Sequence, residues 1–156
     1  MIRIEVSDVA IDGAAALAPL ATLGCGAVAS FTGIARNDAN DQGGVTAIEL
    51  EHYPAMTEAS LGALVDEAVA RWSLLGCVLI HRVGKIAVGE AIVLVGTAAS
   101  HRAEALAACA FLIDRLKTDA PFWKKEHRAD GSANWVDAKA SDEDRADIWS
   151  RANDII

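Results

Sequence analysis

The sequence contains 156 residues, with 14 Lys and Arg against 22 Asp and Glu, which gives a net charge of −8 at pH 7 and a pI near 4.9. A chain of this length is expected to form a single domain over residues 1–156 and to bury about 70% of its unfolded surface without disulfides or a structural metal. The acidic charge argues against nucleic acid as a partner, because binding to a phosphate backbone needs a basic surface.

The cysteines and the N-terminal segment indicate a cytoplasmic protein. Cys25, Cys77 and Cys109 lie far apart and form no C-x-x-C motif, which is typical of a reducing compartment. Residues 2–6 alternate apolar and charged side chains where a signal peptide would be apolar, and no apolar run approaches the ~18 residues of a membrane span. We therefore expect no membrane association. The hydrophobic content of 53% favours additional apolar burial between subunits.

Apolar periodicity predicts strands and helices in mixed order. Alternating or continuous apolar runs mark the strands, and apolar residues at three- and four-residue spacing mark the helices. In chain order the predicted elements are a strand at 2–6, a short helix at 14–23, strands at 26–35 and 45–53, a helix from about Pro54 to near Gly76, strands at 77–83 and 91–98, a helix from Ser100 to about 117, a short strand at 135–136 and a last helix capped by Ser141 and Asp144.

A polar, glycine-ended segment at 37–44 separates two of these strands. We expect it to join 26–35 and 45–53 as an antiparallel pair. With several hairpin-like neighbours in the chain, the predicted fold class is α+β, with a largely antiparallel sheet and packed helices.

Residues 100–126 carry the strongest functional signal. Ser100 is expected to act as the N-cap of a helix, and Pro121 is expected to end that helix near residue 117, so that 121–125 follow as a loop. Residues 100–128 hold six of the 14 Lys and Arg. A cationic locus in an acidic chain indicates a site for a small anionic substrate.

The two ends of this helix differ in how clearly they indicate a ligand. His101 and Arg102 fall in the first turn, where backbone N–H groups and the helix dipole already favour an anion, so two cations there favour a bound phosphate or carboxylate over solvated side chains. Lys117 at the other end is also where the dipole favours a cation. For Lys124 the alternative is an aliphatic stem that lies over Trp123.

Other polar residues give weaker signals. His81 and Arg82 lie in a predicted strand and are interpreted as ordinary core-edge or surface residues. The four histidines show no ligand spacing with Cys or carboxylates. No metal site and no cofactor are therefore predicted.

Five motifs resemble those of the catalytic large subunits of molybdopterin synthase. They are FTGIAR at 31–36, LEHYPAM at 50–56, HRVG at 81–84, SHR at 100–102 and LKTDAPFWKKE at 116–126. They occur in the order of that family, and the resemblance covers most of the chain. Ala35 stands where the family often has valine and Ala55 where it often has glycine, and neither change removes a functional group.

The resemblance implies an α/β-hammerhead-like fold, a homodimer, and a small ubiquitin-like sulfur-carrier subunit at each end of that dimer, which together form a heterotetramer. The implied activity is a sulfur transfer in molybdenum cofactor biosynthesis that converts cyclic pyranopterin monophosphate into the dithiolene of molybdopterin. The sulfur is expected to arrive as a thiocarboxylate on the C-terminal glycine of the carrier.

By position in these motifs, Lys117 and Lys124 are the implied catalytic residues. The implied substrate-binding residues are Ile34, Ala35, Arg36, His101, Arg102, Lys117, Lys124, Lys125 and Glu126. Helix geometry adds an expectation of its own. His101 and Lys117 are sixteen residues apart on one predicted helix, so their backbones would be ~24 Å apart. If both ends serve one reaction, the site must combine two protomers.

The residues alone leave two other functions open. Lys117 could form a Schiff base in an aldolase-like enzyme, with Lys124 as the neighbouring cation. The chain could also be a non-catalytic module that binds a phosphorylated metabolite.

Overall fold

The computed structural model describes residues 1–37, 44–137 and 140–151. In this part of the chain the elements, in order, are β1 (Ile2–Ser7), α1 (Gly13–Leu17), the 3₁₀ helix η1 (Ala18–Thr22), β2 (Ala27–Ile34), β3 (Val45–His52), α2 (Pro54–Trp72), β4 (Gly76–Arg82), β5 (Gly84–Ala87), β6 (Ala91–Ala99), α3 (Arg102–Asp119), β7 (Phe122–Arg128), β8 (Ala133–Val136) and α4 (Ala140–Arg151).

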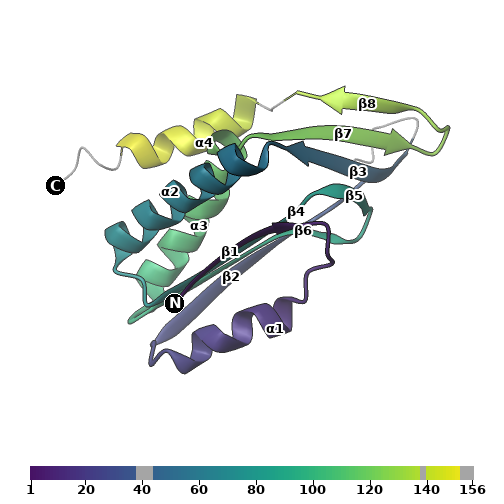
Figure 1. Ribbon diagram of the computed structural model, residues 1–156. Coiled ribbons are helices and arrows are strands. Elements are labelled where there is room, and N and C mark those ends of the chain that lie inside the picture. The colour runs from purple at the N-terminus through teal and green to yellow at the C-terminus, as the bar shows by residue number, and fades with distance from the viewer. Residues whose placement is uncertain (38–43, 138–139, 152–156) are drawn as a thin grey trace.

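The strands form two four-stranded sheets (Figure 1). Sheet A has the strand order β1-β4-β6-β2, and sheet B has the order β5-β3-β7-β8. The β1–β4 pair is parallel and the other pairs are antiparallel. The predicted α+β class with largely antiparallel pairing is confirmed, as two sheets with packed helices.

The predicted hairpin between 26–35 and 45–53 is wrong. β2 pairs with β6 in sheet A, whereas β3 pairs with β5 and β7 in sheet B. β3 alternates buried Ile48 and Leu50 with the more exposed Glu49 and Glu51, which suits a sheet covered on one face. A long connection lets the chain pass from one sheet to the other, so neighbouring strands in the sequence need not pair.

Residues 121–125, predicted as a loop, mostly belong to β7. Pro121 does end α3, whose C-cap Ala120 is extended at φ −94° and ψ 124°, but Phe122 already starts the strand. The strand was missed because charged side chains occupy both of its faces, which hides the apolar alternation. β5 was missed for a related reason, since its four residues lie in a segment that was expected to be a connection.

Two predicted helix caps are also wrong. The N-cap of α3 is His101, at φ −135° and ψ 159° and without a side-chain capping bond, and not Ser100. α4 begins at Ala140, one residue before the predicted cap Ser141. Arg102 is therefore the first residue of α3, and His101 lies just before the first turn instead of within it.

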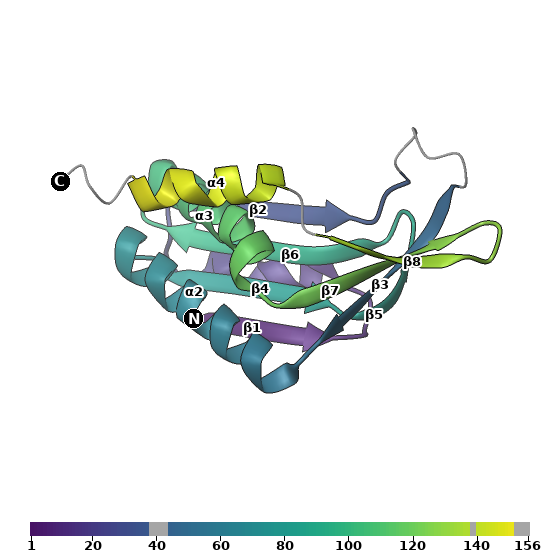
Figure 2. The ribbon, with the colours of Figure 1, turned by 90° about the horizontal axis from the view of Figure 1, so that it is seen from above.

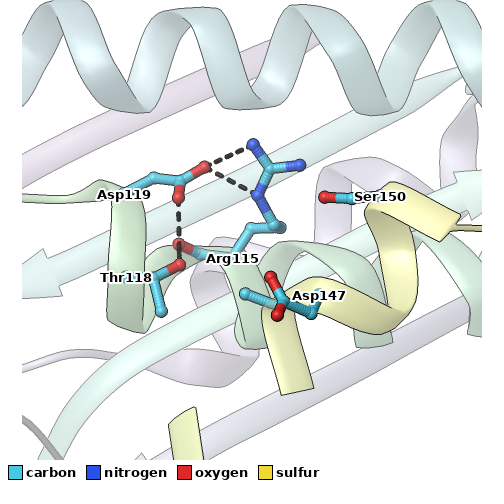
Figure 3. A pocket seen from close by; sticks show the side chains of 6 residues that line it. Arg115, Thr118, Asp119, Asp147 and Ser150 are labelled. Carbon is cyan, nitrogen blue, oxygen red and sulfur yellow. Dashed lines mark hydrogen bonds and ion pairs between the residues drawn. The ribbon is translucent and has the colours of Figure 1, made fainter. Parts of the chain in front are cut away.

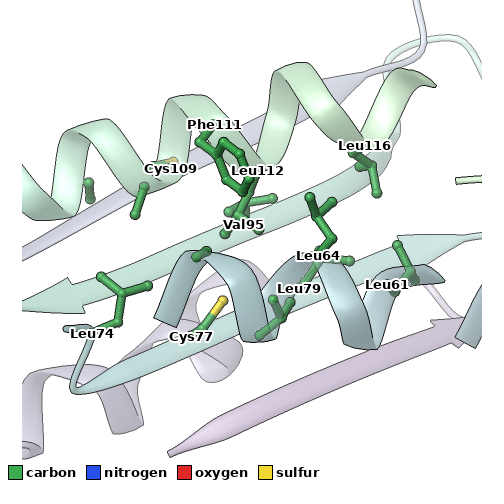
Figure 4. Close-up of a cluster of buried hydrophobic side chains, with 14 of the residues drawn as sticks. Leu61, Leu64, Leu74, Cys77, Leu79, Val95, Cys109, Phe111, Leu112 and Leu116 are labelled. Carbon is green, nitrogen blue, oxygen red and sulfur yellow. The ribbon is translucent and has the colours of Figure 1, made fainter. Parts of the chain in front are cut away.

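The main core lies between sheet A and the helices α2 and α3 (Figure 4). α2 contributes an apolar stripe at helical spacing that includes Leu61, Leu64 and Val65, and α3 contributes Phe111 and Leu112. A second cluster lies on the opposite face of sheet A, under α1 and η1. Every residue of β4 is therefore buried, because both of its faces are covered.

The C-terminal helix α4 packs along α3 (Figure 2). Trp149 meets Trp72 and Phe111 edge to face, with ring centroids 5.8 and 5.6 Å apart, and its Nε1–H donates to Asp114 Oδ2 at 2.9 Å. This contact holds the C-terminal half of α3 from the side opposite the sheet. None of the described helices is long and apolar enough to span a bilayer.

Gly26→Ala is expected to destabilise the fold. A Cβ at Gly26 would lie 2.1 Å from the backbone oxygen of Ser100, which cannot move away as a side chain could. We expect a loss of about 1–3 kcal/mol in the free energy of unfolding, measured by urea denaturation. The control is Gly62→Ala in α2, where nothing lies within 4 Å of the new Cβ and the helix gains about 0.5–1 kcal/mol. Similar effects of both changes would contradict the close approach.

Candidate functional site

α3 fixes the separation of two groups of cations. It is one uninterrupted helix, as predicted, although it runs from Arg102 to Asp119, with His101 and Arg102 at its start and Lys117 in its last turn. All three side chains are exposed. At ~1.5 Å per residue the backbones of His101 and Lys117 are ~24 Å apart. One copy of α3 therefore cannot bring both ends to one small substrate.

β7 carries the second group of predicted site residues. Register pairs Lys124 with Leu50 and Glu126 with Ile48, so these side chains share the face of sheet B that bears buried apolar residues, which we call the inner face. Lys124 Nζ lies 3.2 Å from Glu126 Oε1, and Arg128 Nη2 lies 3.7 Å from Glu126 Oε2. The Glu126 side chain is only 18% exposed, so the carboxylate is held between two cations.

Lys125 lies on the opposite, outer face of sheet B. Strand alternation turns it away from Lys124 and Glu126. Its Nζ sits 4.4 Å from the ring centroid of Trp135 in β8, within range of a cation–π interaction. The structure thus brings Lys124 and Glu126 together and separates Lys125 from them.

The segment that carries Arg36 reaches the inner face from sheet A. Ala35 follows β2 and is buried in one cluster with Ile48 and Leu50. Two backbone bonds hold it: its N–H donates to Glu90 O at 2.9 Å, and its carbonyl accepts from Gly89 at 2.7 Å. Residues 34–36 therefore end beside the same apolar residues that Lys124 and Glu126 flank.

His81 and Arg82 are buried, contrary to their interpretation as ordinary core-edge or surface residues. Each is only 7% exposed. The His81 ring stacks on Phe122 of β7 with centroids 3.9 Å apart and planes 12° apart, and Arg82 Nη1 donates to Glu90 Oε2 at 3.1 Å. The signal that could have found them is their place at the end of a strand whose other residues are continuously apolar, since such a strand is covered on both faces.

Burial keeps His81 neutral. The pKa of His81 falls from 6.5 to about 4, mainly because of desolvation; the hydrogen bond to the Arg82 carbonyl opposes this shift, and nearby His52 adds to it. That bond is 2.8 Å long, and because a carbonyl only accepts, Nδ1 carries the ring proton. At neutral pH the ring is an uncharged packing element.

The two buried cysteine thiols, Cys77 and Cys109, are not poised for chemistry. Burial raises the pKa of Cys77 to about 12 and that of Cys109 to about 11. Because the thiolate is the reactive form, neither sulfur is a ready nucleophile. In the described part of the chain no three His, Cys, Asp or Glu side chains gather where a metal ion could be held.

Two surface hollows among the described residues lie close to the predicted site residues. One of about 340 Å³ lies between the end of α3 and α4, where Arg115 is held by Asp119 at 2.6 Å beside Thr118 and Asp147 (Figure 3). Another of about 320 Å³ lies beside Trp123 and Trp135. Neither is lined by a predicted site residue. In a single chain neither of these two hollows therefore holds the predicted cations.

Comparison with solved structures identifies the class of this fold. A solved structure of the molybdopterin biosynthesis MoaE protein from Burkholderia ambifaria matches with a TM-score of 0.80 and 42% identity, over 96% of this chain and 99% of that one. A Helicobacter pylori chain, solved in a protein–protein complex of subunits 1 and 2 of molybdopterin-converting factor, shares the fold with a TM-score of 0.69 at 20% identity, over 89% of this chain and 90% of that one. The fold is thus that of MoaE structures.

Sequence comparison gives the family. The family model described as MoaE protein matches residues 6–119. The molybdopterin synthase catalytic subunit of Mesorhizobium japonicum is 50% identical over 157 residues, which is 98% of this chain and 95% of the relative. The chain therefore belongs to the MoaE family of molybdopterin synthase catalytic subunits, which are enzymes of molybdenum cofactor biosynthesis.

The neutral state of His81 predicts a loss of stability in acid. The pKa of His81 is lower in the folded chain than in the unfolded one, so its contribution is complete above pH 6.5 and is lost as pH falls toward 4. Between pH 7 and 4.5 this amounts to about 2–3 kcal/mol. Urea unfolding at these two pH values should show that His81→Phe loses less stability than the wild type by about this amount. Equal losses in the two proteins would contradict the assignment.

Proposed function

We propose that this chain converts cyclic pyranopterin monophosphate into molybdopterin, forming the dithiolene with sulfur delivered as a thiocarboxylate on the C-terminal glycine of a small ubiquitin-like carrier. The observation that carries the proposal is the inner face of sheet B, where the Lys124–Glu126 pair at 3.2 Å lies beside the segment that ends in Arg36. Family membership gives the general reaction, and this arrangement supports the specific one.

The residues divide into two roles in this proposal. Arg36, His101 and Arg102 bind the substrate phosphate, because charge-assisted hydrogen bonds from guanidinium and imidazole suit a phosphate monoanion. Lys117 and Lys124 are catalytic: an ammonium beside the thiocarboxylate offsets its charge and can move protons as carbon–sulfur bonds form. Ile34, Ala35 and Glu126 complete the substrate-binding set, whereas Lys125, which the resemblance also implies, lies on the outer face beside Trp135 and has no proposed contact with the substrate.

A carrier is proposed as the sulfur source because two of the three thiols are buried and Cys25 lies outside the motifs that carry the predicted site residues. Cys77 and Cys109 are buried with raised pKa values, and neither is part of the cationic surface. A glycine-ended tail is narrow enough to bring its carboxyl-derived sulfur between Lys117 and Lys124. The three free cysteines also support a cytoplasmic location for this single domain.

The site is proposed to form across a homodimer, as the centre of a heterotetramer with two carriers. The ~24 Å between His101 and Lys117 on one helix requires a second chain if both act on one substrate. β2 lies at an edge of sheet A, and Val28, Phe31 and Ile34 on it, with Leu106 on α3, are large exposed apolar side chains. An apolar strand edge of this kind supports pairing with a second copy.

The direct experiment is reconstitution. Purified chain is mixed with thiocarboxylated carrier protein and cyclic pyranopterin monophosphate, and formation of molybdopterin is measured. Turnover that depends on the thiocarboxylate supports the proposal. Binding of the phosphorylated pterin without turnover would instead support a binding module, and an adduct trapped by borohydride with a carbonyl substrate would support a Schiff-base enzyme.

The two faces of β7 provide a matched pair of variants. Lys124→Ala is expected to lower turnover about 10²–10⁴-fold, because a positioned acid–base group is lost, and Lys117→Ala should behave alike. Lys125→Ala removes the same charge from the next position but on the outer face, and we expect a much smaller effect. Thermal unfolding should be near wild type for all three variants, because a helix-end or strand-surface lysine contributes only ~0.3–1 kcal/mol. Equal losses of turnover for Lys124→Ala and Lys125→Ala would overturn the inner-face site.

A further inference from the structure

Two adjacent residues of β4, His81 and Arg82, have no role in the proposed reaction, yet they contact the two segments that adjoin the proposed site. Because successive strand residues point to opposite faces, His81 faces α2 and α3 while Arg82 faces the other side. We propose that both are positioning residues: His81 sets the placement of residues 117–124, and Arg82 sets the placement of residues 34–36. This inference rests on the proposed function for its kinetic consequences.

His81 acts through Phe122. Its ring lies parallel to that of Phe122 at 3.9 Å, and His52 stacks on Phe122 with centroids 6.1 Å apart. The Nδ1–H bond to the Arg82 carbonyl fixes the plane of the His81 ring. Phe122 stands two residues before Lys124 on the same face of β7, and only Ala120 and Pro121 separate it from α3. The stack therefore fixes β7 relative to the helix end that carries Lys117.

Arg82 acts through the turn that follows β5. Its Nη1–H donates to Glu90 Oε2 at 3.1 Å and to Ala91 O at 3.4 Å. The same Glu90 oxygen accepts from Ala87 N–H at 3.2 Å, which closes the turn. The backbone of this turn binds Ala35 through two hydrogen bonds, from Ala35 N–H to Glu90 O and from Gly89 N–H to Ala35 O. Arg82 thereby fixes the residue directly before Arg36.

The cost of this arrangement argues for a role beyond stability. Arg82 Nε and His52 Nδ1 are buried side-chain nitrogens without a hydrogen-bond partner, and such groups destabilise a fold. The Arg82–Glu90 ion pair offsets little of this cost, because the Glu90 side chain is 49% exposed and water screens the attraction. These polar groups lie where the two sheets meet. The orientation that they give to Phe122 and Ala35 accounts for their presence despite this loss of stability.

The test uses variants that separate ring, charge and stability. His81→Leu removes the flat ring but keeps an apolar side chain, whereas His81→Phe keeps a ring that can stack. Arg82→Met removes the charge, and Arg82→Lys restores it. Val78→Ala on the same strand controls for general destabilisation, because it removes buried volume from the cluster under α1. Val78 takes part neither in the ring stack on Phe122 nor in the hydrogen bonds of Glu90.

The expected results differ between the two residues. His81→Leu should lower kcat at least tenfold with KM for the pterin phosphate within twofold, while His81→Phe stays within threefold of wild type. Arg82→Met should raise that KM at least tenfold with kcat within threefold, and Arg82→Lys should recover part of the loss. Val78→Ala should change neither constant, although it lowers the midpoint of thermal unfolding.

A second readout does not need turnover. The rate at which acetic anhydride labels Lys124, relative to exposed Lys85 on β5, is measured by mass spectrometry. His81→Leu should change this ratio at least threefold, and Arg82→Met should leave it unchanged. If His81→Leu does not fold, Phe122→Leu removes the same stack from the other side and should give the same change.

The outcomes distinguish this inference from the proposed function. A wild-type chain without turnover would reject the proposed function, while the labelling ratio would still test the placement of Lys124. An unchanged ratio in the stack-removing variants would overturn the inference. So would kinetic changes in Val78→Ala that match those of His81→Leu, or loss of the same kinetic constant in the His81 and Arg82 variants.

Discussion

The length of α3 and its fixed position in the fold determine how the proposed site can be assembled. Its 18 residues form one helix, about 27 Å long. The buried Thr97 hydroxyl of β6 donates to Ala105 O at 2.7 Å near the start of the helix, and Leu116 is buried near its end. α4 holds it from the outside through Trp149. A helix fixed along its whole length cannot bend its two cationic ends toward one ligand, so one site that uses both ends must come from two chains.

Sheet A mainly stabilises the fold, whereas sheet B carries proposed site residues. Sheet A, covered on both faces, contains most of the core, whereas sheet B has a small apolar cluster on one face and carries Lys124 and Glu126 there. The sheets meet where His81 of β4 stacks on Phe122 of β7. Because the proposed reaction depends on distances between groups from both sheets, the rigidity of this junction matters more to it than the size of the core.

The sequence predicted individual elements better than their partners. Alternating or continuous apolar runs located all four strands of sheet A, and helical spacing located α2 and α3. The sequence pattern missed β7, because charges on both faces hide its period. It also paired β2 with β3, because the true partner of a strand depends on packing between distant parts of the chain, which local sequence does not show. The implied site residues came from motif resemblance. Only the structure separated Lys125 from Lys124, since the face of a residue depends on strand register, and only the structure revealed the burial of His81 and Arg82.

Subunit complementation tests most directly whether one site is built from two chains. A His101→Ala/Arg102→Ala protein and a Lys117→Ala protein, each inactive alone, are mixed under conditions that exchange subunits, and exchange is verified with differently tagged chains. In a mixed dimer a shared site leaves one pocket with every group intact, so equal mixing should restore roughly a quarter of wild-type turnover. If each site lay within a single chain, both pockets of the mixed dimer would stay broken. No recovery of turnover despite verified exchange would contradict the account.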